Sequence, residues 1–309
     1  MIENTGGKTG EKTEEKTAVI EIAKAAGLTL LSEEERNPLY TTTYGVGEVI
    51  KDAVRNGCRK FIVGIGGSAT NDGGAGMLQA LGFGLLKENG EQIPSGARGL
   101  EELAEITDDN VIPELAECKF KIACDVTNVL CGETGASAVY GPQKGADEEM
   151  TERLDRLLFS YASLVKKKIP KADSMYPGTG AAGGLGFAFL TFMDAQLESG
   201  IQIVIKETGL EQEIAKADLV ITGEGRMDGQ TAMGKAPIGI AKIAKKYGKP
   251  VIAFAGAAAR DAGACNEQGI DAFFPILREA VSLEAAMKRE NAEANMEAAV
   301  EQAYRLWRL

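Results

Sequence analysis

The sequence predicts an α/β protein built on parallel, doubly wound sheets, and three observations indicate this class. Residues 217–276 alternate short apolar strands with helical segments in the order β-α-β-α-β. Residues 61–76 form another apolar, β-branched strand that runs into a glycine-rich loop and then a helix. The 309 residues, 44% hydrophobic and 26% charged, are enough for two ordinary globular domains.

The individual elements follow from composition and periodicity. Residues 1–16 are almost free of apolar side chains and are expected to form a disordered lead-in. A strand is expected at 17–23 and a helix at 47–56, with Thr43 as its cap. Further strands are expected at 120–126, 201–205, 217–222, 250–255 and 271–276, and further helices at 150–167, 187–197, 236–247, 261–268 and 282–309. The last of these helices is expected to pack through a stripe that includes Leu283, Met287, Leu306 and Trp307.

Charge and composition exclude several classes of function. The net charge of -11 argues against nucleic acid or an anionic membrane as the main partner. No apolar run is long enough to span a bilayer, and the polar N-terminus does not resemble a secretory signal. Five cysteines without CxxC spacing favour a reducing cytoplasm over a disulfide framework or a zinc site.

The absence of histidine restricts the available chemistry further. It excludes Ser-His-Asp hydrolysis, histidine general bases and histidine-bound metals. Carboxylates, lysine, arginine, backbone amides and a hard metal ion remain. Phosphoryl transfer needs these groups, because it depends on positioning, charge neutralisation and Mg²⁺.

The glycine-rich loop after residue 65 is the main candidate site. Glycines allow the backbone to approach a ligand, and the N-terminus of a following helix favours anions. Neutral donors stand among the glycines, and one carboxylate is available for a metal ion or a proton. These candidates are Gly66, Gly67, Ser68, Thr70, Asn71, Asp72 and Gly73. A tight turn with a capped helix is the simpler alternative.

Two other patterns leave alternatives open. Gly64-Ile-Gly66-Gly-Ser-Ala69 matches a dinucleotide fingerprint, with Glu88 at the distance of a ribose contact, although such a match alone is weak. Residues 177–186 form a second glycine loop before a helix. This loop either faces an anion or allows close packing of the helix, and the sequence favours neither.

Several longer blocks, in the same order, resemble the bacterial glycerate kinase family, the type that phosphorylates the 2-hydroxyl of D-glycerate. The resemblance covers nearly everything after Thr17. Its blocks are Asn37-Pro-Leu-Tyr-Thr-Thr-Thr-Tyr-Gly45, the stretch 64–76, Ala123-Cys-Asp-Val126, Gly141-Pro-Gln-Lys-Gly145, Gly180-Ala-Ala-Gly-Gly-Leu-Gly186, and the stretch 221–231 with Gly234-Lys-Ala-Pro237.

The resemblance implies two α/β domains, one inserted in the other. Residues 17–205 would form the inserted domain and 206–309 the C-terminal part of a Rossmann-like domain. The Ala-Pro-Asp-Ser-Phe-Lys loop and the Asp-Gly-Gly-Glu-Gly segment that usually open family members are absent from the sequence. We therefore expect an N-terminally shortened member, with its Rossmann-like sheet incomplete on that side and its activity in doubt.

The resemblance also implies ATP and D-glycerate as substrates, with Mg²⁺. The loop at 66–74 would hold the glycerate carboxylate or the transferring phosphoryl group. Catalytic roles are expected for Asp72, Asp228 and Lys144, metal binding for Asp125 and Glu224, and phosphate binding for Arg226 and Lys235. Asp72 is the first candidate for the general base, and Lys144 would neutralise phosphate charge.

Two competing functions remain open at this stage. One is a non-catalytic protein that binds glycerate or nucleotide, and the other is an NAD-linked oxidoreductase. The sequence does not decide between 2- and 3-phosphorylation, nor which loop binds ATP. It leaves the oligomeric state open, with a homo-oligomer among the possibilities.

Overall fold

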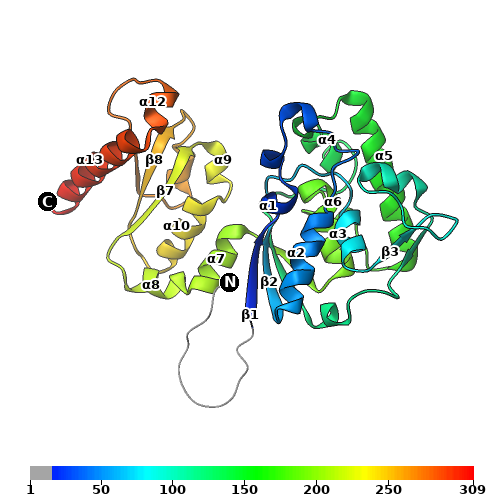
Figure 1. The fold of residues 1–309 in the computed structure, drawn as a ribbon. Helices are drawn as coiled ribbons and strands as arrows, with labels where there is room; N and C mark the ends of the chain where they lie inside the picture. Colours follow the sequence, from blue (N-terminus) through cyan, green and yellow to red (C-terminus); the bar gives the residue numbers. More distant parts are fainter. Residues whose placement is uncertain (1–15) are drawn as a thin grey trace, which may run out of the picture. The chain divides into compact units, whose positions relative to one another are not determined.

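A computed structural model describes residues 16–309 and confirms the α/β class (Figure 1). The chain divides into two compact units between Ser199 and Gly200. The domain boundary expected between 205 and 206 lies inside helix α7 (Gly200–Thr208). The expected lead-in lies outside the described residues, except for Lys16, which begins β1. The insertion of one domain in the other stays a prediction.

The first unit is built on a parallel sheet with the order β1-β2-β5-β6. A short antiparallel pair, β3 and β4, lies apart from it. The strands are β1 (Lys16–Glu21), β2 (Cys58–Gly64), β3 (Gly84–Leu86), β4 (Glu105–Thr107), β5 (Lys119–Ala123) and β6 (Ala195–Glu198). The helices are α1 (Ala23–Ala26), α2 (Tyr44–Arg55), α3 (Ala75–Ala80), α4 (Ala136–Tyr140), α5 (Glu148–Lys168) and α6 (Ala181–Phe192). Short 3₁₀ helices cover Leu28–Leu30, Glu33–Glu35, Ala97–Glu102, Pro113–Glu117 and Pro142–Lys144.

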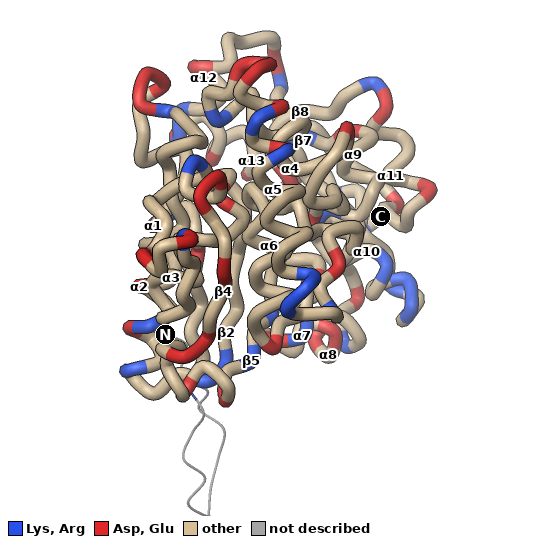
Figure 2. Tube along the Cα trace, turned by 90° about the vertical axis from the view of Figure 1, so that its right-hand side faces the viewer, with Lys and Arg blue, Asp and Glu red and all other residues tan. Residues whose placement is uncertain are grey.

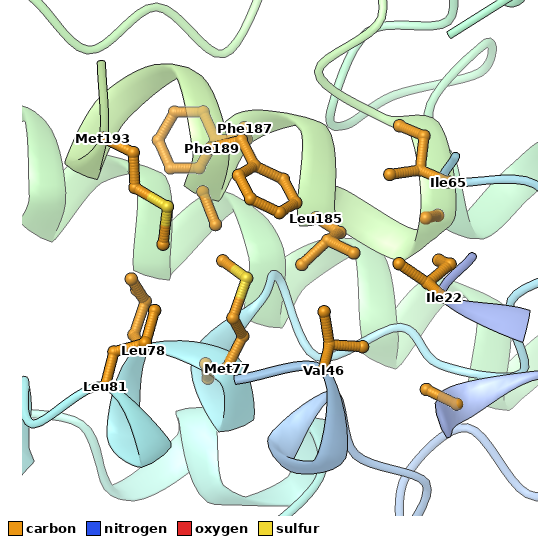
Figure 3. Close-up of a cluster of buried hydrophobic side chains, with 14 of the residues drawn as sticks. Ile22, Val46, Ile65, Met77, Leu78, Leu81, Leu185, Phe187, Phe189 and Met193 are labelled. Carbon is orange, nitrogen blue, oxygen red and sulfur yellow. The ribbon is translucent and has the colours of Figure 1, made fainter. Parts of the chain in front are cut away.

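The core of this unit lies between the sheet and the helices that cover it. Phe61 of β2 and Phe120 of β5 are register partners, and their rings stack with centroids 4.6 Å apart. Figure 3 shows Met77 of α3 pointing toward Leu185 and Phe187 of α6. Burying one such side chain contributes about 1.5–3 kcal/mol, so this packing fixes the two helices against each other.

The second unit contains a three-stranded parallel sheet with the order β7-β8-β9. Its strands are β7 (Val220–Met227), β8 (Val251–Ala258) and β9 (Ala272–Pro275). Its helices are α7, α8 (Leu210–Lys216), α9 (Gly229–Ala232), α10 (Ala236–Lys246), α11 (Ala264–Glu267), α12 (Leu283–Met287) and α13 (Arg289–Trp307). The predicted β-α-β-α-β order is therefore present.

Two predicted elements within residues 187–205 differ from the structure. Residues 201–205 form helix α7 instead of a strand, and Ile203 and Ile205 are both buried although they lie on different faces of this helix. The alternating pattern therefore reflects burial of the helix on two sides. The helix expected at 187–197 ends at Phe192, and the chain then adds β6 to the sheet. The five residues 201–205 are too few to distinguish the two-residue period of a strand from the 3.6-residue period of a helix.

The C-terminal tail also differs from its prediction. Two helices, α12 and α13, replace the single one, with a break at the extended residue Lys288. The expected packed stripe is wrong in large part, since Leu283 is 78% exposed, Met287 75% and Leu306 64%. Within the described tail, Ala303 is the buried member of that stripe.

Lysine, arginine, aspartate and glutamate are interspersed along the described trace (Figure 2). Among the described residues, no helix has both the length and the apolar composition required to cross a membrane.

Candidate functional site

A pocket of about 250 Å³ opens at the carboxyl ends of β2 and β5. The two strands are parallel neighbours, so the segments that follow them emerge at the same edge of the sheet. In open α/β sheets, ligands bind at this edge. Polar or glycine residues that line the pocket include Gly66, Gly67, Ser68, Asp125, Tyr140 and Lys144. The structure thus brings together candidates that the sequence places far apart.

The glycine loop divides into two parts with different surroundings. Gly66 and Gly67 are exposed and line the pocket together with Ser68. The following residues, Thr70 and Asn71, are 1% and 0% exposed. The side-chain amide of Asn71 donates to Ser137 Oγ at 2.9 Å. The first part of the loop is therefore open to a ligand, whereas the second part is buried in the protein.

Asp72 is fully buried and its carboxylate is surrounded by donors. Oδ2 accepts hydrogen bonds from the Thr43 amide at 2.8 Å, the Thr43 hydroxyl at 2.9 Å and the Gly76 amide at 3.2 Å. Oδ1 accepts one from the Gly74 amide at 3.1 Å. Burial raises the pKa of Asp72, and the hydrogen bonds from Thr43, Gly76 and Gly74 oppose that rise.

This network changes the expected role of the helix that follows the loop. The carboxylate of Asp72 already occupies the N-terminus of α3, where an external anion was expected. Thr43 likewise makes no capping bond to α2, because its hydroxyl donates to Asp72 and accepts from the Met77 amide. The dinucleotide arrangement is also absent, since α3 begins only at Ala75, well after Ala69.

The second glycine loop packs against the first, backbone to backbone. The Gly73 amide donates to the Gly183 carbonyl at 2.9 Å. A Cβ on Gly183 would lie 2.0 Å from the Thr70 carbonyl oxygen, so no side chain fits there. Ala182 has a φ of 54° and is the described non-glycine residue with a left-handed backbone. Close packing therefore explains these glycines, while Ala181 and Ala182 also line the pocket.

Lys144 contributes a buried cation to the pocket. It ends the turn Pro142–Lys144, is 2% exposed, and donates from Nζ to the Thr70 carbonyl at 2.6 Å. Burial lowers the pKa of Lys144 to about 7, against the opposing charge of Asp72. No described carboxylate forms an ion pair with it.

The remaining predicted residues belong to the second unit. Glu224 and Arg226 lie within β7 rather than in a loop after it, because β7 continues to Met227. Asp228 caps α9, and the Thr231 amide that donates to Oδ1 at 3.0 Å lowers the pKa of Asp228. Lys235 Nζ lies 4.0 Å from Glu224 Oε1.

The two predicted metal ligands show different surroundings. Asp125 is exposed at the edge of the pocket, just beyond the end of β5. Glu224 Oε2 is buried and has no hydrogen-bond partner. Among residues 16–309, no three acidic, cysteine or histidine side chains converge as a metal cluster would require.

Two contributors to the pocket were not singled out from the sequence. Tyr140 lines it and donates its hydroxyl to Asn128 Oδ1 at 2.6 Å. Cys124 lines it from the residue before Asp125. Tyr140 carries no local signal, because it reaches the pocket only through tertiary packing. Cys124 immediately follows β5 and shares the strand-end position that identified Asp125.

Comparisons with known proteins agree with the sequence blocks described above. A family profile described as "Glycerate kinase family" matches residues 2–308. A glycerate kinase of Halalkalibacterium halodurans is 49% identical over 93% of this chain and 75% of its own length. A glycerate 2-kinase of Escherichia coli is 49% identical over 88% of this chain and 72% of its own length. A crystal structure assigned to glycerate kinase 2 of Salmonella typhimurium LT2 matches with a TM-score of 0.81 and 48% identity, over 93% of this chain and 75% of that one.

Proposed function

Since this chain belongs to the glycerate kinase family, we propose that it is a kinase that transfers the γ-phosphoryl group of ATP to D-glycerate. The proposed products are 2-phosphoglycerate and ADP. Family membership over nearly the whole chain carries the proposal. The pocket beside Gly66 and Lys144 supports it, because it combines amide donors and a cation at a small site.

The acceptor acid is proposed to bind in this pocket, with Asp125 beside its reacting hydroxyl. Asp125 is the carboxylate that lines the pocket, so we assign it the role of general base. The hydroxyl oxygen attacks the γ-phosphorus as its proton passes to Asp125, and the bond from that phosphorus to ADP breaks. Asp72, with both oxygens engaged, is proposed to shape the loop instead of touching the substrate.

Two exposed cations of the second unit are proposed to bind phosphate. Arg226 is exposed on β7 and Lys235 is exposed at the start of α10, and both would neutralise phosphate charge. The hydrogen bonds by which Asp228 caps α9 would hold the turn that links the two residues along the chain.

Glu224 fits a Mg²⁺ ligand, because one of its carboxylate oxygens is buried without a partner. Mg²⁺ is commonly held by one or two carboxylates together with substrate phosphates. When bound, the ion would neutralise charge on those phosphates.

A coupled assay of ADP release with D-glycerate, ATP and Mg²⁺ tests the function directly. We expect release that depends on D-glycerate, with 2-phosphoglycerate identified by phosphorus NMR. Asp125→Asn should lower kcat by about 10²-fold or more if the carboxylate is the base. Asp109→Asn, at an exposed carboxylate in the turn after β4, serves as the matched control.

Two results would contradict the proposal. Calorimetric binding of D-glycerate without turnover would favour the non-catalytic alternative. NADH binding together with oxidation of a hydroxy acid, in place of phosphoryl transfer, would favour an oxidoreductase.

A further inference from the structure

Lys144 is a buried cation whose donors are only partly used. Its ammonium group has three N–H donors. The described chain offers it one acceptor, the Thr70 carbonyl, and no ion pair. A charge that is 2% exposed, forms no ion pair and is opposed only by the more distant charge of Asp72 is costly to bury. Two donors are therefore available to a ligand, and an anion would compensate the charge.

Residues with unused backbone donors border the same pocket after the end of β2. Gly66, Gly67 and Ser68 all line it. Their amides donate to no acceptor in the described part of the chain, although the carbonyl of Gly67 accepts from the Leu28 amide. The loop is thus anchored through its carbonyl side and leaves three successive N–H groups unused.

Gly66 also keeps the pocket free of side-chain atoms. A Cβ built at this position meets no heavy atom within 4 Å, and its φ lies outside the left-handed region. The fold itself would therefore accept alanine at position 66. A glycine at this position is explained by space for a ligand better than by packing or backbone strain.

The size of the pocket indicates which anion it takes. Its volume of about 250 Å³ lies below the roughly 300–1,000 Å³ that is typical of sites for drug-sized ligands. A three-carbon acid fits inside it as a whole, whereas a nucleotide could place only part of itself there. A carboxylate has two oxygens with about four acceptor positions, which suits several convergent N–H donors.

We infer that Lys144 Nζ and the amides of Gly66, Gly67 and Ser68 bind the carboxylate of the acceptor acid, and not a phosphoryl group of the nucleotide. The identity of the acid as D-glycerate rests on the proposed function. The sequence alone leaves two ligands open for the loop at 66–74, the acceptor carboxylate and the transferring phosphoryl group. This assignment gives the open part of the loop to the carboxylate. It also gives Lys144 a role in substrate recognition.

Isothermal calorimetry on the full chain tests this assignment. The ligands are D-glycerate, glycerol, inorganic phosphate and ADP; glycerol keeps hydroxyls but lacks the carboxylate. Lys144→Met should weaken D-glycerate binding by about 10- to 100-fold, the loss expected for hydrogen bonds to a charged group. Gly66→Ala should weaken it as well, because the methyl group enters the pocket. ADP binding should change less than twofold in both variants.

Gly263→Ala is the matched control, because a Cβ there also meets no atom within 4 Å and the position lies in the second unit. Gly66→Ala keeps the test valid even if Lys144→Met folds poorly. Glycerol binding as tightly as D-glycerate would overturn the inference. Weaker phosphate and ADP binding with unchanged D-glycerate binding would overturn it too, and would assign the donors to the phosphoryl group.

The inference and the proposed function fail separately. D-Glycerate binding that depends on Lys144 and Gly66, without phosphoryl transfer by the parent protein, would remove the function and support the inference. Normal phosphoryl transfer and D-glycerate binding in both variants would retain the function and refute the inference.

Discussion

Replacing Lys144 with methionine should change how protein stability depends on pH. Methionine has a similar length and fills the same space without a charge. The pKa of the lysine is lowered from its ordinary value of 10.5 to about 7 by burial in the folded protein. Between these values the unfolded chain binds a proton that the folded chain does not bind. The stability of the parent protein therefore rises with pH across this interval because of Lys144.

The magnitude follows from the width of the interval. Each pH unit within it is worth about 1.4 kcal/mol in the free energy of unfolding. Between pH 10.5 and about 7 the free energy of unfolding changes by about 5 kcal/mol because of Lys144. The protein loses this stability as the pH falls to about 7. Lys144→Met lacks this contribution, so its stability relative to the parent should be greatest near pH 7 and decline toward pH 10. The lost hydrogen bond to Thr70 shifts the difference by about 1 kcal/mol at every pH and leaves the slope unchanged.

Urea unfolding followed by far-ultraviolet circular dichroism, at several pH values between neutral and alkaline, measures this slope. The transition of the first unit, which contains Lys144, is fitted on its own. Lys167→Met, at an exposed position of α5, is the control and should give a difference that does not vary with pH. A Lys144→Met curve parallel to that of the parent would refute the burial argument, because it would mean that Lys144 titrates normally in the folded state.

Three further predictions concern the loops and a cysteine. Asp72→Asn should lower the unfolding free energy by about 2–4 kcal/mol, since an amide replaces one of the acceptor oxygens; an unchanged urea midpoint would contradict this. Gly183→Ala and Gly209→Ala share left-handed φ values of 68° and 65°, but only position 183 has no room for a Cβ. Melting curves should show a loss near 1–2 kcal/mol at 209 and a clearly larger one at 183; equal losses would contradict the close packing. Burial raises the pKa of Cys131 to about 12, so mass spectrometry should find it alkylated far more slowly at neutral pH in the folded than in the unfolded protein, and equal rates would contradict its burial.

The sequence predicted the main layers because their signals are local. The run from Phe61 to Ile65 identified a buried strand, and the spacing of apolar residues in 150–167 identified the long helix α5. Apolar patterns of only five residues were less reliable. Residues 201–205 fit a strand or a helix, and tertiary packing decided in favour of the helix. Element type was thus predictable where the pattern was long or strongly β-branched.

The candidate site was predictable in position but not in detail. The glycine loop was identified from composition, because five glycines exceed what a turn needs. Nothing local indicated that Asp72 would turn inward toward Thr43, a residue distant in the sequence. The burial of Lys144 likewise depends on the carbonyl of Thr70. Long-range hydrogen bonds of this kind leave no periodic pattern, so the division of the loop into an open and a buried part required the structure.

The contact between the two glycine loops also bears on how the first unit assembles. The bond from the Gly73 amide to the Gly183 carbonyl closes a very long stretch of chain. Closing so long a loop costs entropy before any packing compensates for it, and distant contacts of this kind slow folding. During synthesis, β1, β2 and β5 emerge well before residue 183, so the pocket is completed only when α6 arrives. Binding competence should therefore appear late in folding, after most of the secondary structure of this unit has formed.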